Sequence, residues 1–270
     1  MTIALAGIGQ NIMFVFGGLA LFLFGINLMS DSLKAAAGSK LKSIIEKSTN
    51  TPLKGILVGI LLTVLIQSSS GTTALTIGLL RAGLMTLPQS VGIIMGANIG
   101  TTVTAFIIGL PIAKFGYIFL AIGVIMTFIG KKKIHHFGGV LAGLGMLFVG
   151  LEVMGSGLKP LANTAEAEQM FAVFSQNWFL GTIFGTVFTG VVQSSSAAIG
   201  VLEKLYALNA EGIDTITLSG AIPILLGANI GTTITAFLAS LGGNTESKRA
   251  AFVHVLFNVL MAVVFLIILN

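Results

Sequence analysis

Residues 96–106 read GANIGTTVTAF, and residues 227–237 read GANIGTTITAF, so one segment occurs twice with a single Val-to-Ile change. A shorter segment, QSSS, occupies residues 67–70 and returns at residues 193–196. Both pairs occur in the same order, at offsets of 131 and 126 residues, and a weaker similarity at offset 125 precedes them. Several motifs that recur in one order indicate a tandem duplication. We therefore predict two repeats, in residues 1–133 and 134–270.

The composition excludes a soluble protein. Charged residues make up 9% of the 270 residues and hydrophobic residues 55%, with a mean hydropathy of +1.02, whereas soluble proteins carry about 25% charged residues. The net charge is +5, but the basic residues lie in short gaps between apolar runs, a pattern of membrane topology and not of nucleic-acid binding. The sequence has no Cys, which excludes disulfides, cysteine zinc sites and thiol catalysis. We predict an all-α polytopic membrane protein.

Each repeat is predicted to contain the same elements. An apolar helix of membrane-spanning length comes first, followed in the first repeat by an amphipathic, Lys-bearing stretch at the membrane interface (34–47). Two pairs of short apolar segments follow, and a long apolar helix closes the repeat. We interpret the first pair, interrupted at QSSS, as a re-entrant hairpin, and the second, interrupted at GANIGTT, as a broken transmembrane helix. The segments are 12–30, 53–66 with 71–80, 84–95 with 103–113, and 115–130 in the first repeat, and 137–154, 178–192 with 197–206, 217–226 with 234–241, and 250–269 in the second.

The charged residues support this topology. If the hairpins return to their starting side and the broken helices cross, three of the 14 Lys and Arg residues share one face (Lys114, Lys159 and Lys204) and the others share the opposite face. The positive-inside rule makes the second face cytoplasmic. Three crossings in each repeat then place the second repeat inverted relative to the first. Paired interrupted segments in inverted repeats indicate the binding site of a transporter. The residues on the cytoplasmic face are Lys34, Lys40, Lys42, Lys47, Lys54, Arg81, Lys131, Lys132, Lys133, Lys248 and Arg249.

The two motifs carry groups that suit a small anion and a hard cation. A helix broken inside the bilayer frees N–H groups, which attract anions, and carbonyl groups, which suit cations. Neutral oxygen ligands suit Na⁺. Because no Lys or Arg lies deep in the predicted membrane region, we expect cation-coupled transport of a small oxyanion. Hydroxyl donors come from Ser68, Ser69, Ser70, Thr72, Thr73, Ser194, Ser195 and Ser196, and cation ligands from Gln67, Asn98, Thr101, Thr102, Gln193, Asn229, Thr232 and Thr233.

Doubled QSSS motifs, each followed by GANIGTT, resemble the type II sodium–phosphate cotransporters, specifically their short bacterial members, over both repeats. The resemblance implies a transporter and not an enzyme, without a cofactor, that carries inorganic phosphate with Na⁺ across the bacterial plasma (inner) membrane. It implies that Ser68–Ser70 and Ser194–Ser196 line the phosphate site where the hairpin tips meet. His254, Phe257 and Asn258 resemble a His-x-x-Phe-Asn element of the family, here without a neighbouring acid, which leaves ion stoichiometry open. The implied sodium site comprises Gln193, Ser194, Asn229, Thr232 and Thr233, with Gln67, Ser68, Asn98, Thr101 and Thr102 as symmetry partners.

Other interpretations of these residues stay open. Gly96-x-x-x-Gly100 alone is more often a helix-packing motif than an unwound loop, and intramembrane Ser and Thr often bond only their own backbone. The near-identical repeats favour binding. For His254 and Asn258, interhelical hydrogen bonding and site contact are equally favoured.

Three other functions compete with symport. An intramembrane serine hydrolase is disfavoured because only one half carries an intramembrane His and the sequence has no Gly-x-Ser-x-Gly elbow. A cation-independent phosphate exporter or channel would have a similar anion site, and Na⁺ dependence separates it from a symporter. A sensor without transport would tolerate replacement of the serine triplets.

The predicted mechanism is alternating access. Na⁺ binding orders the hairpin tips, phosphate binds between the serine triplets, and the hairpin bundle moves against scaffold helices 12–30, 115–130, 137–154 and 250–269. A homodimer through the scaffold helices is one way to hold such a frame fixed. The expected partners are inorganic phosphate, Na⁺ and the lipid bilayer, and nucleic acid is excluded.

Overall fold

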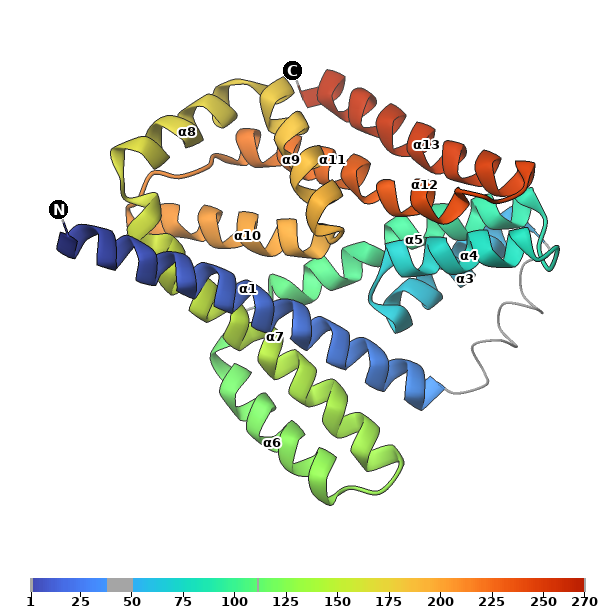
Figure 1. Ribbon diagram of the computed structural model, residues 1–270, viewed down its shortest axis with the longest axis horizontal. Helices are drawn as coiled ribbons and strands as arrows, with labels where there is room; N and C mark the ends of the chain where they lie inside the picture. The colour runs from blue at the N-terminus through green and yellow to red at the C-terminus, as the bar shows by residue number, and fades with distance from the viewer. Residues whose placement is uncertain (1, 38–50, 111, 270) are drawn as a thin grey trace. The chain divides into compact units, whose positions relative to one another are not determined.

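The computed structural model describes residues 2–37, 51–110 and 112–269, which form helices joined by turns (Figure 1). The all-helical prediction is confirmed for these residues. Most of the expected interfacial stretch 34–47 lies outside them. The helices are α1 (Thr2–Ala37), α3 (Pro52–Ile66), α4 (Ser69–Arg81), α5 (Leu87–Ile108), η1 (Ala113–Phe115), α6 (Gly116–Ile129), α7 (Lys133–Ala162), α8 (Ala165–Gln176), α9 (Trp178–Val192), α10 (Ser195–Leu208), η2 (Asn209–Glu211), α11 (Leu218–Thr232), α12 (Ile234–Ser240) and α13 (Thr245–Leu269).

Five helices among the described residues are long and apolar enough to cross a membrane: α1, α5, α7, α11 continued by α12, and α13. The helices α8 and α9 form a bent pair, at 106°, which would add a sixth span. The prediction for residues 115–130 is wrong in length, because α6 has 14 residues. A helix of that length measures about 21 Å, less than the roughly 30 Å of a bilayer core.

The chain divides into two compact units, and each predicted repeat contributes to both. Unit 1 comprises the described residues of Met1–Ala36, Ile107–Gly181 and Ile199–Ile222. Unit 2 comprises those of Ala37–Phe106, Thr182–Ala198 and Pro223–Asn270. Three of the four expected scaffold helices lie in unit 1. The fourth, α13, belongs to unit 2 together with both QSSS motifs, and the scaffold role of all four helices stays a prediction.

In unit 1, glycines allow α1 and α7 to pack backbone against backbone. A Cβ at Gly25 would lie 2.6 Å from the carbonyl oxygen of Gly143, and a Cβ at Gly150 would lie 2.7 Å from that of Gly18. The contacted position on α7 moves back from 150 to 143 as the position on α1 advances from 18 to 25, so the helices are antiparallel. At offset 125, Gly18 and Gly25 correspond to Gly143 and Gly150. Equivalent helices of the two repeats therefore contact each other in opposite directions.

In unit 2, α3 and α4 form an antiparallel hairpin, close to the predicted segments 53–66 and 71–80. Thr51 caps the start of α3, where its Oγ1 accepts a hydrogen bond from the N–H of Lys54 at 3.3 Å, and proline occupies the first helical position. The hydroxyl of Thr63 on α3 donates to the hydroxyl of Thr72 on α4 at 3.0 Å. Neither helix is long enough to cross a bilayer. An apolar cluster of Val58, Leu62, Ile66, Met85 and Ile93, with Leu79 packed against it, holds the hairpin to α5.

The GANIGTT segments do not break their helices. The helix α5 continues through Gly96–Thr102 without interruption. Between α11 and α12 stands only Thr233, whose φ of −67° and ψ of −16° are helical. The expected broken transmembrane helices are therefore wrong in both repeats; of the predicted interruptions, only those at QSSS contain non-helical backbone in the described residues.

The glycines of these segments permit close helix packing instead. A Cβ at Gly96 would collide with the carbonyl oxygen of Ile56 on α3, and a Cβ at Gly100 would lie 2.9 Å from that of Ile60. The same contacts recur in the second repeat, where Gly227 and Gly231 meet carbonyl oxygens of α9. The helix-packing interpretation of Gly-x-x-x-Gly is therefore correct for the glycines themselves.

Candidate functional site

All of the predicted phosphate and sodium residues lie in unit 2. They occupy the two QSSS tips, the helix α5, and the helices α11 and α12. The hydrogen bonds described for these side chains join residues of the same repeat, with one exception that links α5 to α13. Convergence of the two tips on one phosphate stays a prediction.

Both QSSS motifs form the same turn between two helices. Gln67 follows α3 with a φ of 54°, and Gln193 follows α9 with a φ of 55°, both in the left-handed region. The next residue, Ser68 or Ser194, caps the following helix, because its Oγ accepts a hydrogen bond from the N–H three residues later, at 3.0 and 3.2 Å. Serine is a preferred N-cap for this reason. The repeated sequence thus produces a repeated tip.

The glutamines occupy backbone positions that would suit glycine better. Helices often end in the left-handed conformation, usually at Gly. A residue with a Cβ pays about 1–2 kcal/mol to adopt this conformation. Sparsely populated backbone conformations of this kind cluster at functional sites. Glutamine at both tips is compatible with the predicted ligand role of the side-chain amide, which stays a prediction.

The remaining serines of each triplet keep unused donors. Ser69 and Ser70 begin α4, and Ser195 and Ser196 begin α10, so their N–H groups precede the first hydrogen bond of the helix ladder. Their hydroxyls take part in none of the hydrogen bonds of the described residues. Hydroxyl and N–H donors at a helix start are a donor set that suits an oxyanion.

Thr72, a predicted phosphate ligand, is used within the first hairpin. It is fully buried, and its Oγ1 donates to the carbonyl oxygen of Ser68 at 3.0 Å while accepting from Thr63. In the second repeat Ala198 stands at this position. The hydroxyl of Thr189, which corresponds to Thr63, is consequently buried without a partner among the described residues. Thr72 stabilises the first tip, and its contact with phosphate stays a prediction.

The side chain of Gln67 is held by Thr104, a residue that the sequence interpretation missed. Gln67 is 6% exposed; its Oε1 accepts from the Thr104 hydroxyl at 3.0 Å, and its Nε2 donates to the carbonyl oxygen of Val64 at 2.5 Å. The amide oxygen keeps a second lone pair. Gln193 is exposed and makes no side-chain hydrogen bond with the described residues. The duplicated segment that contains Thr104 was the signal that could have identified it.

Asn98 links α5 to α13. Its Nδ2 donates to Oδ1 of Asn258 at 3.3 Å, and Nδ2 of Asn258 donates to the carbonyl oxygen of His254 at 2.8 Å. The interhelical interpretation therefore holds for Asn258. His254 is 1% exposed, and neither ring nitrogen has a partner among the described residues. Asn229, which corresponds to Asn98, is exposed.

The four threonines of the GANIGTT motifs bond to their own helices. Each hydroxyl donates to a carbonyl oxygen three or four residues earlier, at 2.7 to 3.1 Å. A hydroxyl that donates its hydrogen still presents lone pairs to a cation. Thr232 and Thr233 are buried, Thr101 is half-buried and Thr102 is exposed. The arrangement is compatible with cation ligation, which stays a prediction.

Comparison with known proteins identifies the family. The family model described as Na⁺/Pi-cotransporter matches residues 21–156 and again residues 151–269. The uncharacterized protein YqeW of Bacillus subtilis is 33% identical over 240 residues, which cover 88% of this chain and 76% of that protein. No solved structure matches the chain.

Two further relatives carry functional names. YjbB of Escherichia coli, provisionally named an inorganic phosphate export protein, is 26% identical over 258 residues, which cover 95% of this chain but only 46% of that protein. The human sodium-dependent phosphate transport protein 2B is 35% identical over 106 residues, which cover 38% of this chain and 15% of that protein. The chain thus spans less than half the length of these two relatives.

One family model therefore matches each half of the chain, in agreement with the repeated tips and the repeated glycine contacts. The family consists of transporters and not enzymes, and its description names phosphate as the substrate. The resemblance of the QSSS and GANIGTT motifs to sodium–phosphate cotransporters is confirmed. This chain is a multi-pass membrane protein of the Na⁺/Pi-cotransporter family.

Proposed function

We propose that the chain is a secondary active transporter that carries inorganic phosphate together with Na⁺ across the bacterial plasma membrane by alternating access. The observation that carries the proposal is the repeated QSSS tip, which presents unused serine donors beside a glutamine in the left-handed conformation. Both tips belong to unit 2.

Phosphate would bind between Ser68–Ser70 and Ser194–Ser196. The first serine of each triplet accepts the cap bond through a lone pair and keeps its hydrogen for an anion. The second and third serines add hydroxyls and N–H groups. The four basic side chains described in unit 2 (Lys54, Arg81, Lys248 and Arg249) lie at helix ends away from the tips. Co-bound cations would therefore balance the charge of the phosphate.

Sodium would bind beside each tip through neutral oxygens. In the first repeat these are the amide oxygens of Gln67 and Asn98 and the hydroxyls of Thr101 and Thr102. In the second repeat they are Gln193, Asn229, Thr232 and Thr233. The orientation of the threonine hydroxyls, with hydrogens directed to the backbone, supports this assignment. Bound Na⁺ would order the glutamine side chain and add positive charge next to the serines.

The two repeats, residues 1–133 and 134–270, would have inverted topologies. The antiparallel contact between the equivalent helices α1 and α7 supports this arrangement. Alternating access would then move the QSSS hairpins against the scaffold helices. A homodimer stays a prediction, which a mass measurement of the detergent-solubilised protein would test.

The test is uptake of labelled phosphate into proteoliposomes under an inward Na⁺ gradient, compared with an equal K⁺ gradient. Accumulation above equilibrium only with Na⁺ is the expected result. Equal uptake with both cations would refute sodium coupling. Absence of phosphate flux from folded protein would refute the substrate.

A second candidate function is cation-independent phosphate export on the same scaffold, which the name of YjbB favours. The tips would bind phosphate in the same way, but Gln193 would not bind a sodium ion. Efflux from phosphate-loaded proteoliposomes without Na⁺ on either side distinguishes the two functions. Efflux at the full rate without Na⁺ would favour the exporter.

A further inference from the structure

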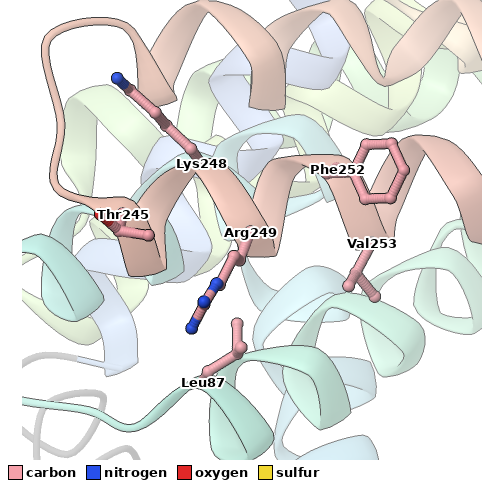
Figure 2. A pocket seen from close by; sticks show the side chains of 6 residues that line it. All are labelled: Leu87, Thr245, Lys248, Arg249, Phe252 and Val253. Carbon is pink, nitrogen blue, oxygen red and sulfur yellow. The ribbon is translucent and has the colours of Figure 1, made fainter.

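The helix α13 enters the predicted membrane region beside a pocket in unit 2 (Figure 2). The pocket has a volume of about 420 Å³ and is lined by one residue of α5, Leu87, and by five residues of α13. Their spacing of three and four residues places them on one face of the helix. Polar residues come first and apolar residues one turn deeper. The α13 residues are Thr245, Lys248, Arg249, Phe252 and Val253.

The basic side chains that the structure describes in unit 2 gather at this end of the unit. Arg81 ends α4, and the residue before it packs against the first turns of α13. Lys54 lies in the first turn of α3, where a Cβ at Gly55 would lie 3.3 Å from the carbonyl oxygen of Gln89, in the first turn of α5. With the two basic residues of the pocket, four cations face a single described carboxylate, Glu246. This excess attracts an anion.

The two cations of the pocket differ in their partners. Nη1 of Arg249 binds Oε1 of Glu246 at 2.9 Å, which leaves further guanidinium donors unused. Lys248 has no carboxylate within 4 Å among the described residues. Figure 2 shows the guanidinium of Arg249 extending toward Leu87, whereas the Lys248 side chain extends away from Leu87, at the edge of the same broad face. The pocket surface itself is apolar, so the charged groups of Arg249 and Lys248 lie at its rim.

We propose that an acidic phospholipid of the cytoplasmic leaflet binds here, with its headgroup at the basic rim and an acyl chain against the apolar surface of the pocket. The excess of Lys and Arg assigns this end of unit 2 to the cytoplasm, and basic pockets between transmembrane helices on that side suit anionic lipid headgroups. The order of residues along α13 matches the ligand: the lipid phosphate lies at Arg249, and an acyl chain follows Phe252, which is 65% exposed. A free phosphate ion would gain nothing from the apolar surface of the pocket.

The test measures binding of phosphatidylglycerol and of phosphatidylcholine to the purified full chain by native mass spectrometry. We expect phosphatidylglycerol to bind in preference, and Arg249→Gln to weaken its binding about fivefold, the usual effect of one basic residue near a membrane surface. Arg249→Lys should restore most of the binding. The matched control is Arg81→Gln, which removes a charge at the same end of the unit, because Arg81 does not line the pocket. Thermal unfolding establishes that each variant is folded.

Three outcomes would overturn the proposal. Equal binding of the zwitterionic lipid would show that the negative charge of the headgroup does not contribute to binding. An equal loss in Arg81→Gln would show a diffuse attraction without a pocket. Displacement of phosphatidylglycerol by millimolar inorganic phosphate would show a site for the free anion. None of these outcomes depends on sodium coupling, so the test is independent of the proposed transport function.

Discussion

Replacing Gln193 by glycine separates the role of its side chain from that of its backbone. Gln193 has a φ of 55°, a conformation that costs a residue with a Cβ about 1–2 kcal/mol and glycine little. Gln193→Gly should therefore be about 1 kcal/mol more stable than Gln193→Ala, which keeps the unfavourable backbone. Both variants lose the amide oxygen. A hydrogen-bond-like contact with a charged group contributes about 1.5–3 kcal/mol, so both should need at least about tenfold more Na⁺ for half-maximal phosphate uptake.

The assay combines thermal unfolding of the purified protein with a Na⁺ titration of uptake in proteoliposomes. Gln67 provides a matched comparison, because its φ is 54° but its side chain accepts a hydrogen bond from Thr104. Gln67→Gly should gain less stability than Gln193→Gly, since it leaves the Thr104 hydroxyl without that partner. Wild-type sodium activation in Gln193→Gly would refute the ligand role. Equal stability of the glycine and alanine variants would refute the backbone argument.

Three further perturbations test the packing and the tip. Gly59→Ala should destabilise the protein by several kcal/mol, because the added Cβ would collide with a carbonyl oxygen of α5. The Cβ of Gly78→Ala would meet no atom within 4 Å, so this variant should stabilise α4 by about 0.5–1 kcal/mol in the same unfolding measurement. Thr104→Val should cost about 1–3 kcal/mol, because a buried amide oxygen loses its donor, and a Tm equal to that of the wild type would contradict the hydrogen bond. Ser195→Ala should raise the half-saturating phosphate concentration about tenfold without lowering the Tm, because the Ser195 hydroxyl has no described partner. Ser194→Ala should have the same effect on phosphate and should also lower the stability by about 1 kcal/mol, because the helix loses its cap. Unchanged phosphate affinity in both variants would argue against the site.

The sequence predicted where the two tips lie but not their serine caps, although these caps depend only on neighbours along the chain. A hydroxyl three residues before a free N–H caps a helix wherever the two occur together, so Ser68 and Ser194 act alike. Duplication then required that Gln67 and Gln193 share one backbone conformation, as they do. The hairpin α3–α4 was also predictable, because two short apolar segments joined by a tip are close in the chain and pack on each other.

The sequence by itself determined the membrane class, the duplication and the two tips, because hydropathy, repetition and capping are properties of nearby residues. Tertiary structure alone decided what Gly96 and Gly100 do. A residue without a Cβ permits an unwound backbone and also permits a close neighbour, and only the position of α3 shows that the second applies. The same holds for α13, which joins unit 2 through partners far away in the chain, such as Asn98 with Asn258. Contacts between distant segments depend on which surfaces pack together, and no local pattern specifies them.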